Sequence, residues 1–149
     1  MTAVDLSQFT ALVTTRGAAE DLERLLLSLR RFAPHLHVLA ATGGDALGRA
    51  DIDCIARPAQ GGVAAARNAL LARVRTPYFV LLSDDLELHD AAALERLCEP
   101  VSAKRFDLVA GELLRCEKRL LLFSKRTPVT TPLFSPLVLA PHRTRQAPS

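Results

Sequence analysis

The chain has no tryptophan, one tyrosine and one methionine, and aromatic residues make up only 5% of its 149 residues. Hydrophobic residues nevertheless account for 49% of the sequence, so a core must be built mainly from Leu, Val and Ala. A chain of this length corresponds to one domain or less. The composition therefore predicts a single small domain with an aliphatic core.

Disulfide and export signals are also missing. The three cysteines, Cys54, Cys98 and Cys116, are widely spaced and form no Cys-x-x-Cys pair, which disfavours a disulfide framework or structural zinc and predicts reduced thiols. The opening segment, MTAVDLSQF, has no basic region followed by an apolar run, so no signal peptide is expected. No segment approaches the roughly 20 apolar residues that cross a bilayer. Together these features predict a cytoplasmic protein.

The chain has only a small excess of positive charge, and this excess is concentrated toward its C-terminal end. The formal net charge of +3 is too small to indicate a nucleic-acid partner. After Glu112 the only acidic residue is Glu117, whereas the basic residues there are Arg115, Lys118, Arg119, Lys125, Arg126, Arg143 and Arg145. Such an end is typical of a soluble basic tail, and the alternative is a weak contact with an anionic membrane surface or a partner protein.

Several common site motifs are absent. The glycine pairs at 43–44 and 61–62 do not form the G-x-G-x-x-G pattern of dinucleotide-binding Rossmann folds, and there is neither a phosphate-binding P-loop nor a G-x-S-x-G motif. His35 and His37 form an H-x-H pair without a third ligand at recognisable spacing, which favours strand-face histidines over a metal site.

Apolar runs and helical periodicity alternate along the chain. Strands are predicted at 9–13, 35–41, 52–56, 78–82 and from 107 to 110, and helices at 18–32, 62–75 and 91–98, the last capped by Asp90 and broken by Pro100. Residues 113–123 are ambiguous between strand and helix. This order predicts an α/β fold, a parallel-rich sheet with helices on both faces, over residues 1–123. Residues 124–149, interrupted by prolines, are expected to form a flexible, disordered tail.

The segment after the fourth predicted strand carries the chemistry. The run at 78–82 is apolar without alternation, as in a strand buried on both faces, and it stops at Ser83-Asp84-Asp85. Open α/β sheets bind ligands at this carboxyl edge, and hard carboxylate oxygens suit Mg²⁺ or Mn²⁺ and, through the metal, a diphosphate. The alternative is a polar turn that only ends the strand.

Three features in this order resemble a known family. Thr14-Thr15 precedes the helical segment LERLLLSL at 22–29, and Gly62 opens a helix that carries Ala66-Arg67-Asn68. A Tyr-led apolar strand then runs into Ser83-Asp84-Asp85. From Phe9 to about Leu114, the sequence resembles the nucleotide-binding half of GT-A-fold glycosyltransferases, the family-2-like group.

The resemblance implies a site and a reaction. A nucleotide-diphosphosugar would bind at the strand ends, with Mg²⁺ or Mn²⁺ held by the D-x-D-type motif, and its sugar would pass to an acceptor hydroxyl. Asp85 matches the metal ligand, and Ser83 stands where the family commonly has the first Asp. The residues that the resemblance assigns to nucleotide-sugar binding are Thr14, Thr15, Arg67, Ser83 and Asp84.

The sequence departs from the family at two further places. The family usually has an acidic pair after its second strand, where this chain has Ala40-Ala41-Thr42. An acceptor half with a general base should follow the fifth strand, but Glu112 and Glu117 are the only acids there. Two hypotheses therefore stand: a hexosyl- or N-acetylhexosaminyl-type transferase domain, or a truncated, non-catalytic binding or interaction module of the same fold.

Overall fold

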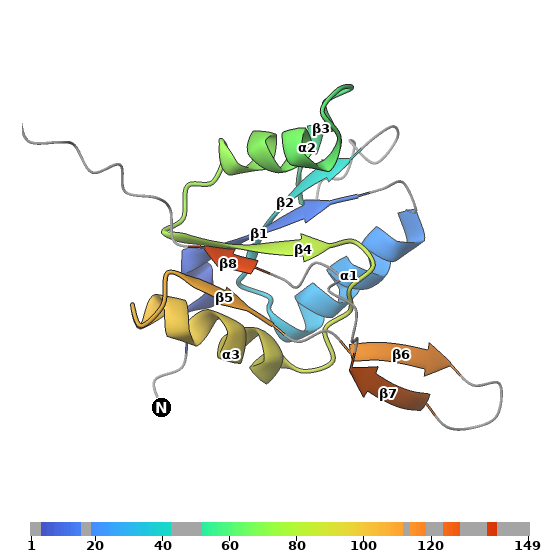
Figure 1. The fold of residues 1–149 in the computed structure, drawn as a ribbon, viewed down its shortest axis with the longest axis vertical. Helices are drawn as coiled ribbons and strands as arrows, with labels where there is room; N and C mark the ends of the chain where they lie inside the picture. The colour runs from blue at the N-terminus through green and yellow to red at the C-terminus, as the bar shows by residue number, and fades with distance from the viewer. Residues whose placement is uncertain are drawn as a thin grey trace, which may run out of the picture.

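The computed structural model describes residues 4–15, 19–42 and 52–111, and the backbone of three further strands at 114–118, 124–128 and 137–139. After a short 3-10 helix at Leu6–Gln8, strands are interleaved with helices up to about residue 110, and the described elements beyond are strands (Figure 1). The strands are β1 (Phe9–Thr14), β2 (His37–Thr42), β3 (Asp53–Ala56), β4 (Tyr78–Ser83), β5 (Leu108–Ala110), β6 (Leu114–Lys118), β7 (Ser124–Pro128) and β8 (Leu137–Leu139). The helices are α1 (Ala19–Phe32), α2 (Gly62–Leu71) and α3 (Ala91–Ser102).

Six of the described strands form one sheet in the order β3-β2-β1-β4-β8-β5, while β6 and β7 pair separately. β1 runs parallel to both β2 and β4, and β2 runs parallel to β3. β8 is antiparallel to both of its neighbours, β4 and β5. The predicted parallel-rich α/β sheet is therefore confirmed, with one antiparallel strand inserted near an edge.

The strand that precedes the acidic motif has a neighbouring strand on each side. β4 lies between β1 and β8. Its residues Phe79, Val80 and Leu82 are buried, whereas Tyr78 and Leu81 are partly exposed. The ring of Tyr78 stacks on that of Phe9 with 5.0 Å between centroids. An apolar run without alternation is needed here because both faces of the strand are covered.

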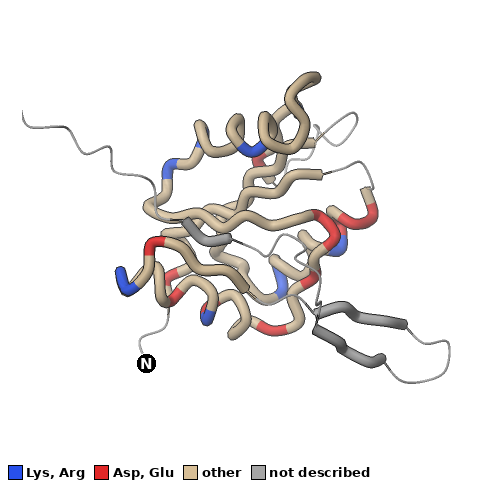
Figure 2. The backbone as a smooth tube through the Cα atoms, viewed as in Figure 1, with Lys and Arg blue, Asp and Glu red and all other residues tan. Residues whose placement is uncertain are grey.

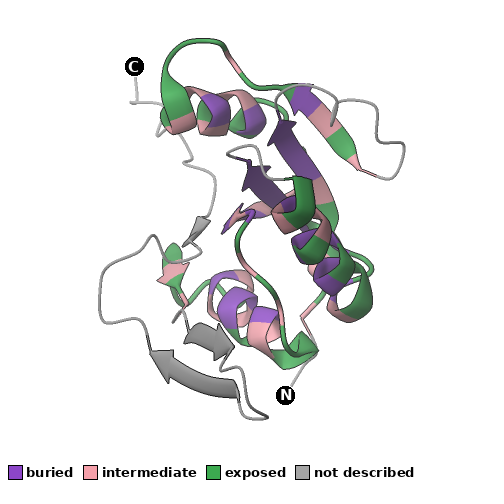
Figure 3. Ribbon diagram, turned by 90° about the vertical axis from the view of Figure 1, so that its right-hand side faces the viewer, coloured by how far each residue is buried: buried purple, intermediate pink, exposed green. Residues whose placement is uncertain are grey.

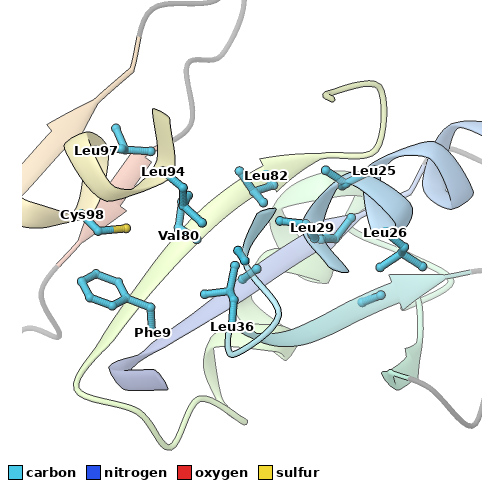
Figure 4. Close-up of a cluster of buried hydrophobic side chains, with 14 of the residues drawn as sticks. Phe9, Leu25, Leu26, Leu29, Leu36, Val80, Leu82, Leu94, Leu97 and Cys98 are labelled. Atoms are coloured by element: carbon cyan, nitrogen blue, oxygen red, sulfur yellow. The ribbon is translucent and has the colours of Figure 1, made fainter. Parts of the chain in front are cut away.

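Helices cover both faces of the sheet, as the sequence predicts. Alternate residues of β1 face opposite ways: Ala11 and Val13 join the core under α1 and α3, and Leu12 joins the core under α2. Figure 3 shows the purple interior strands between the helices, and Figure 4 shows the larger cluster. In α1 the buried leucines recur at helical spacing, at Leu22, Leu25, Leu26 and Leu29.

Two parts of the expected flexible tail are strands. β7 pairs with β6, and β8 pairs with both β4 and β5. These two segments therefore differ from the expected disordered tail. Pro136 and Pro141 flank β8 in the sequence instead of lying within it, so neither interrupts its pairing. Pro128 ends β7, where a missing N–H removes little from the ladder. The other residues of the predicted tail lie outside the described residues.

The third helix also differs from expectation. α3 does not end before Pro100 but continues to Ser102. Val101 is 1% exposed, so its burial holds the last turn in place. Pro100 removes only its own N–H, and its carbonyl accepts from the N–H groups of Arg105 and Phe106. Within the described ranges, none of the helices has the length and apolar content needed to cross a membrane.

Candidate functional site

The carboxyl ends of the four parallel strands meet at one edge of the sheet, where the arrowheads of β1, β2 and β4 point in Figure 1. At this edge Thr14 of β1 stands opposite both Ser83 of β4 and Ala41 of β2. Thr42 of β2 stands opposite Ala56 of β3. The predicted strand-end residues are therefore brought together by register.

Thr14 and Thr15 are the last residue of β1 and the residue after it, at this edge of the sheet. Both side chains are buried, at 9% and 6% exposure. The N–H of Thr15 donates to the carbonyl of Ala41 at 3.2 Å, which ties the end of β1 to β2 after the strand itself has stopped. The structure places both threonines where the sequence predicts a nucleotide-sugar to lie.

The acidic motif forms a tight turn. The N–H of Leu86 donates to the carbonyl of Ser83 at 3.2 Å, so the chain reverses immediately after β4. Asp84 is buried, with 5% exposure, while Asp85 is exposed. Because the turn begins at Ser83, the alternation of faces along β4 does not continue to Asp85, and Ser83 and Asp85 are not placed on one face as they would be in a longer strand.

Two hydrogen bonds fix the segment that follows the acidic turn. The hydroxyl of Ser28 on α1 accepts a hydrogen bond from the N–H of Leu88 at 3.1 Å. On the other side Asp90 caps α3, as predicted, by accepting from the N–H of Ala93 at 2.5 Å. Figure 2 shows acidic backbone segments after β4 and at the start of α1, on the side toward which β4 points.

Arg67 lies on α2, the helix that covers the face of the sheet opposite to α1 and α3. α2 packs over β1 and β2, and Arg67 is half-buried next to the fully buried Ala66. The helix starts after Gly61, whose φ of +88° favours glycine. A Cβ on Gly61 would lie 2.6 Å from the Cβ of Ala65, so the small residues of this motif allow the tight entry into α2.

Few side chains at this edge could bind a metal ion. Asp84 and Asp85 are adjacent, but in the part of the chain that the structure describes no group of three His, Cys, Asp or Glu side chains gathers to hold a metal ion. His37, part of the H-x-H pair, instead has its Nε2 3.0 Å from Oδ2 of Asp53, at the amino ends of β2 and β3. Mg²⁺ commonly binds through one or two carboxylates plus substrate phosphates, so the acidic turn fits that class of site.

A general base is not assigned by the described residues. Of the two acids after β5, Glu117 lies in β6 and Glu112 lies outside the described residues.

Sequence reasoning missed two residues at this edge. Arg57 follows β3, and its Nη1 donates to the carbonyl of Thr15 at 3.3 Å while its backbone N–H donates to the carbonyl of Thr42 at 2.8 Å. The hydroxyl of Thr42 is buried and has no hydrogen-bond partner among the described residues. The sequence did contain a signal for them, because Thr42 directly follows the second predicted strand and Arg57 directly follows the third.

Solved structures of similar fold include three from different organisms. They are S. aureus TarS 1–349 (TM-score 0.53, 16% identity), the mannosyltransferase PcManGT from Pyrobaculum calidifontis in complex with GDP-Man and Mn²⁺ (0.59, 18%), and Rv0371c from Mycobacterium tuberculosis H37Rv (0.51, 21%). The matches cover 67%, 75% and 72% of this chain, and 34%, 36% and 65% of those proteins. The chain thus spans about a third of the length of the first two. At these identities the similarity shows the fold alone.

Sequence comparison gives a more specific match. The family described as Glycosyl transferase family 2 matches residues 10–146, which is most of the chain. No curated protein matches the sequence. The family match spans all of the strands and helices that build the edge described above.

Proposed function

Because the chain belongs to glycosyl transferase family 2, we propose that it binds a nucleotide-diphosphosugar at the carboxyl edge of its sheet and serves transfer of the sugar to an acceptor hydroxyl. One observation carries the proposal. The register of β1 with β4 sets Thr14 opposite Ser83, immediately before the turn that holds Asp84 and Asp85. Ligands of open α/β sheets bind at such an edge.

The roles follow from position and burial. Thr14 and Thr15 form the floor under the nucleotide. Ser83 offers a hydroxyl to the ribose, and Arg67 offers a cation from α2. Asp84 is buried and shapes the turn, whereas the exposed Asp85 is the carboxylate available to a metal ion.

The proposed cofactor is Mg²⁺ or Mn²⁺. One exposed carboxylate with a buried neighbour fits an ion whose remaining ligands come from the diphosphate and water. When bound, such an ion would offset the charge that develops on the leaving diphosphate. A protein of similar fold has been solved with GDP-Man and Mn²⁺, which supports this assignment.

Calorimetric titration with UDP and GDP, with and without Mn²⁺, tests the binding step. We expect Asp85→Ala to abolish the metal-dependent part of the affinity. Asp107→Ala is the matched control, because Asp107 is also exposed but precedes β5, whose first residue lies at the opposite edge. Equal metal-dependent affinities in the wild type and both variants would contradict the assignment.

Turnover is measured separately, as release of free nucleotide from UDP- and GDP-linked hexoses and N-acetylhexosamines. Release that depends on Asp85 supports the transferase. Metal-dependent binding without any release supports the alternative, a nucleotide-binding module of the same fold that does not catalyse transfer.

A further inference from the structure

The strands β6 and β7 form a hairpin that is separate from the main sheet. They pair antiparallel with each other, from Leu114 opposite Pro128 to Lys118 opposite Ser124. In the described part of the chain neither strand pairs with the six-stranded sheet, and Figure 1 shows the hairpin outside that sheet. A two-stranded hairpin by itself is at best marginally stable in water, so this one calls for a partner surface.

The register gives the hairpin no apolar face with which to pack on the domain. Directly opposed residues of two antiparallel strands share a face, and the faces alternate along each strand. Lys118 and Arg126 therefore belong to one face of the hairpin, and Arg115 and Lys125 belong to the other. Because Lys and Arg are almost never fully buried, neither face is suited to cover an aliphatic core.

The hairpin also holds the excess positive charge of the protein. Residues 114–128 contain one acidic residue, Glu117, and five basic ones, which gives a net charge of +4. The whole chain has 19 basic and 16 acidic residues, so the residues outside the hairpin have 14 and 15 and a net charge of −1. A segment with this charge is attracted to an anionic surface. The five basic residues are Arg115, Lys118, Arg119, Lys125 and Arg126.

The sequence that joins the two strands is mostly apolar. Five residues lie between Lys118 and Ser124, and they read Arg-Leu-Leu-Leu-Phe, with four apolar residues in succession at 120–123. Connections between strands are normally polar, so such a run indicates a contact made by function. Lys118, Lys125 and Arg126 are within three residues of the run, which is about 10 Å along a strand.

An anionic lipid surface offers both kinds of contact at matching depths. Interfacial segments bury apolar side chains about 5–10 Å into the boundary between headgroups and acyl chains, and each nearby Lys or Arg adds attraction to anionic lipids. A nucleic acid would attract the same cations, but its phosphate backbone offers no contact for three successive leucines.

We propose that the β6–β7 hairpin docks the protein on an anionic membrane surface. Residues 120–123 enter the apolar boundary, while Lys118, Lys125 and Arg126 contact the lipid headgroups. The inference does not depend on the proposed function, because the hairpin is separate from the sheet edge at which the nucleotide-sugar is proposed to bind.

Flotation of the full chain with lipid vesicles tests the inference. The vesicles contain phosphatidylcholine alone, or phosphatidylcholine with phosphatidylglycerol, at low and at high salt. Three double variants are compared with the wild type, and their unfolding midpoints establish that each is folded. The control variant removes two basic residues that lie beyond β8 instead of in the hairpin. The charge variant is Lys125→Gln with Arg126→Gln, the apolar variant is Leu121→Ser with Leu122→Ser, and the control variant is Arg143→Gln with Arg145→Gln.

We expect the wild type and the control variant to bind vesicles that contain phosphatidylglycerol, and to bind phosphatidylcholine vesicles at least about tenfold more weakly. High salt should weaken the binding, because it screens the attraction between the cations and the lipid surface. The charge variant and the apolar variant should each bind at least about tenfold more weakly than the wild type. All three variants should keep the metal-dependent affinity of the wild type for UDP or GDP.

Four results would overturn the inference. The first is a wild type that does not bind the anionic vesicles, and the second is a control variant that loses as much binding as the charge variant. Unchanged binding by the apolar variant is the third, because attraction by charge alone needs no apolar run. The fourth is binding of the wild type to poly(U) RNA but not to vesicles, which would assign the hairpin to a nucleic acid. Failure to bind any nucleotide would defeat the proposed function alone, since vesicle binding is measured without nucleotide.

Discussion

The hydroxyl of Ser28 accepts a hydrogen bond from the N–H of Leu88 at 3.1 Å and donates one to the carbonyl of Leu25 at 2.8 Å. Ser28 is 6% exposed, in the buried stripe of α1. One short side chain therefore fixes the backbone that follows the acidic turn to the helix that follows β1.

We expect Ser28→Ala to affect both stability and the site. The N–H of Leu88 loses its partner, which costs about 1–3 kcal/mol if it stays buried. The acidic turn is then less firmly placed, so metal-dependent nucleotide affinity should fall. Ser102→Ala is the control, because Ser102 also donates to a carbonyl three residues back, at 3.0 Å, but lies at the end of α3. Equal nucleotide affinities in the two variants would show that Ser28 has no role in the site.

A second prediction concerns the amino ends of β1 and β4. The hydroxyl of Thr76 donates to the carbonyl of Tyr78 at 2.7 Å, so the buried Thr10 must be the donor in its own 2.7 Å bond to Thr76. Thr76→Val should orphan the Thr10 hydroxyl and lower the free energy of unfolding by about 1–3 kcal/mol. Thr76→Ser keeps the hydroxyl and should lose much less. Urea denaturation measures the difference, and a Val variant as stable as the Ser variant would contradict it.

Much of the fold follows from local patterns in the sequence. The apolar run from Tyr78 to Leu82 indicates a strand covered on both faces, and the leucine spacing of α1 indicates a helix with one buried face. The Asp90 cap is equally local. These features are readable because each depends on residues within a few positions of one another.

The remaining features depend on contacts between distant segments. β8 is only three residues long and pairs with β4 and β5, which lie far away in the chain. The hydrogen bond from Arg57 to Thr15 joins residues 42 positions apart. The pattern of β4 does not indicate the turn at Ser83 either, because the alternation of faces ends where the strand does. The spacing of apolar residues within one segment does not indicate such contacts.

The insertion of β8 gives a third prediction. A chain that ends at Pro128 lacks this strand, so β4 and β5 lose the partner that lies between them. We expect the unfolding midpoint to fall by several degrees, because losing about 1 kcal/mol shifts a domain of this size by a few degrees. Val138→Pro tests the same point without shortening the chain, because it removes an N–H from an internal strand. A midpoint equal to that of the wild type in both variants would show that β8 contributes little.

The fourth prediction is a loss of stability at alkaline pH that depends on Cys98. Cys98 is fully buried in the core under α3, and burial raises the pKa of its thiol from an ordinary 9.0 to about 12. In the unfolded chain the thiol ionises from about pH 9, whereas in the folded protein it stays protonated. The contribution of the protonated thiol to the free energy of unfolding is therefore present in full below pH 9 and is lost as the pH rises from about 9 toward 12.

The slope of this loss identifies its source. A single proton retained only by the folded state lowers the free energy of unfolding by about 1.4 kcal/mol per pH unit. The comparison is with Cys98→Ala, which keeps the other ionisable groups of the protein and lacks only this thiol. Urea denaturation at pH 8, 9 and 10 should show the wild type losing stability more steeply than the variant, even if the variant is less stable at pH 8 because of the small cavity. Parallel pH profiles for the two proteins would mean that Cys98 ionises as readily in the folded core as in the unfolded chain, which its burial argues against.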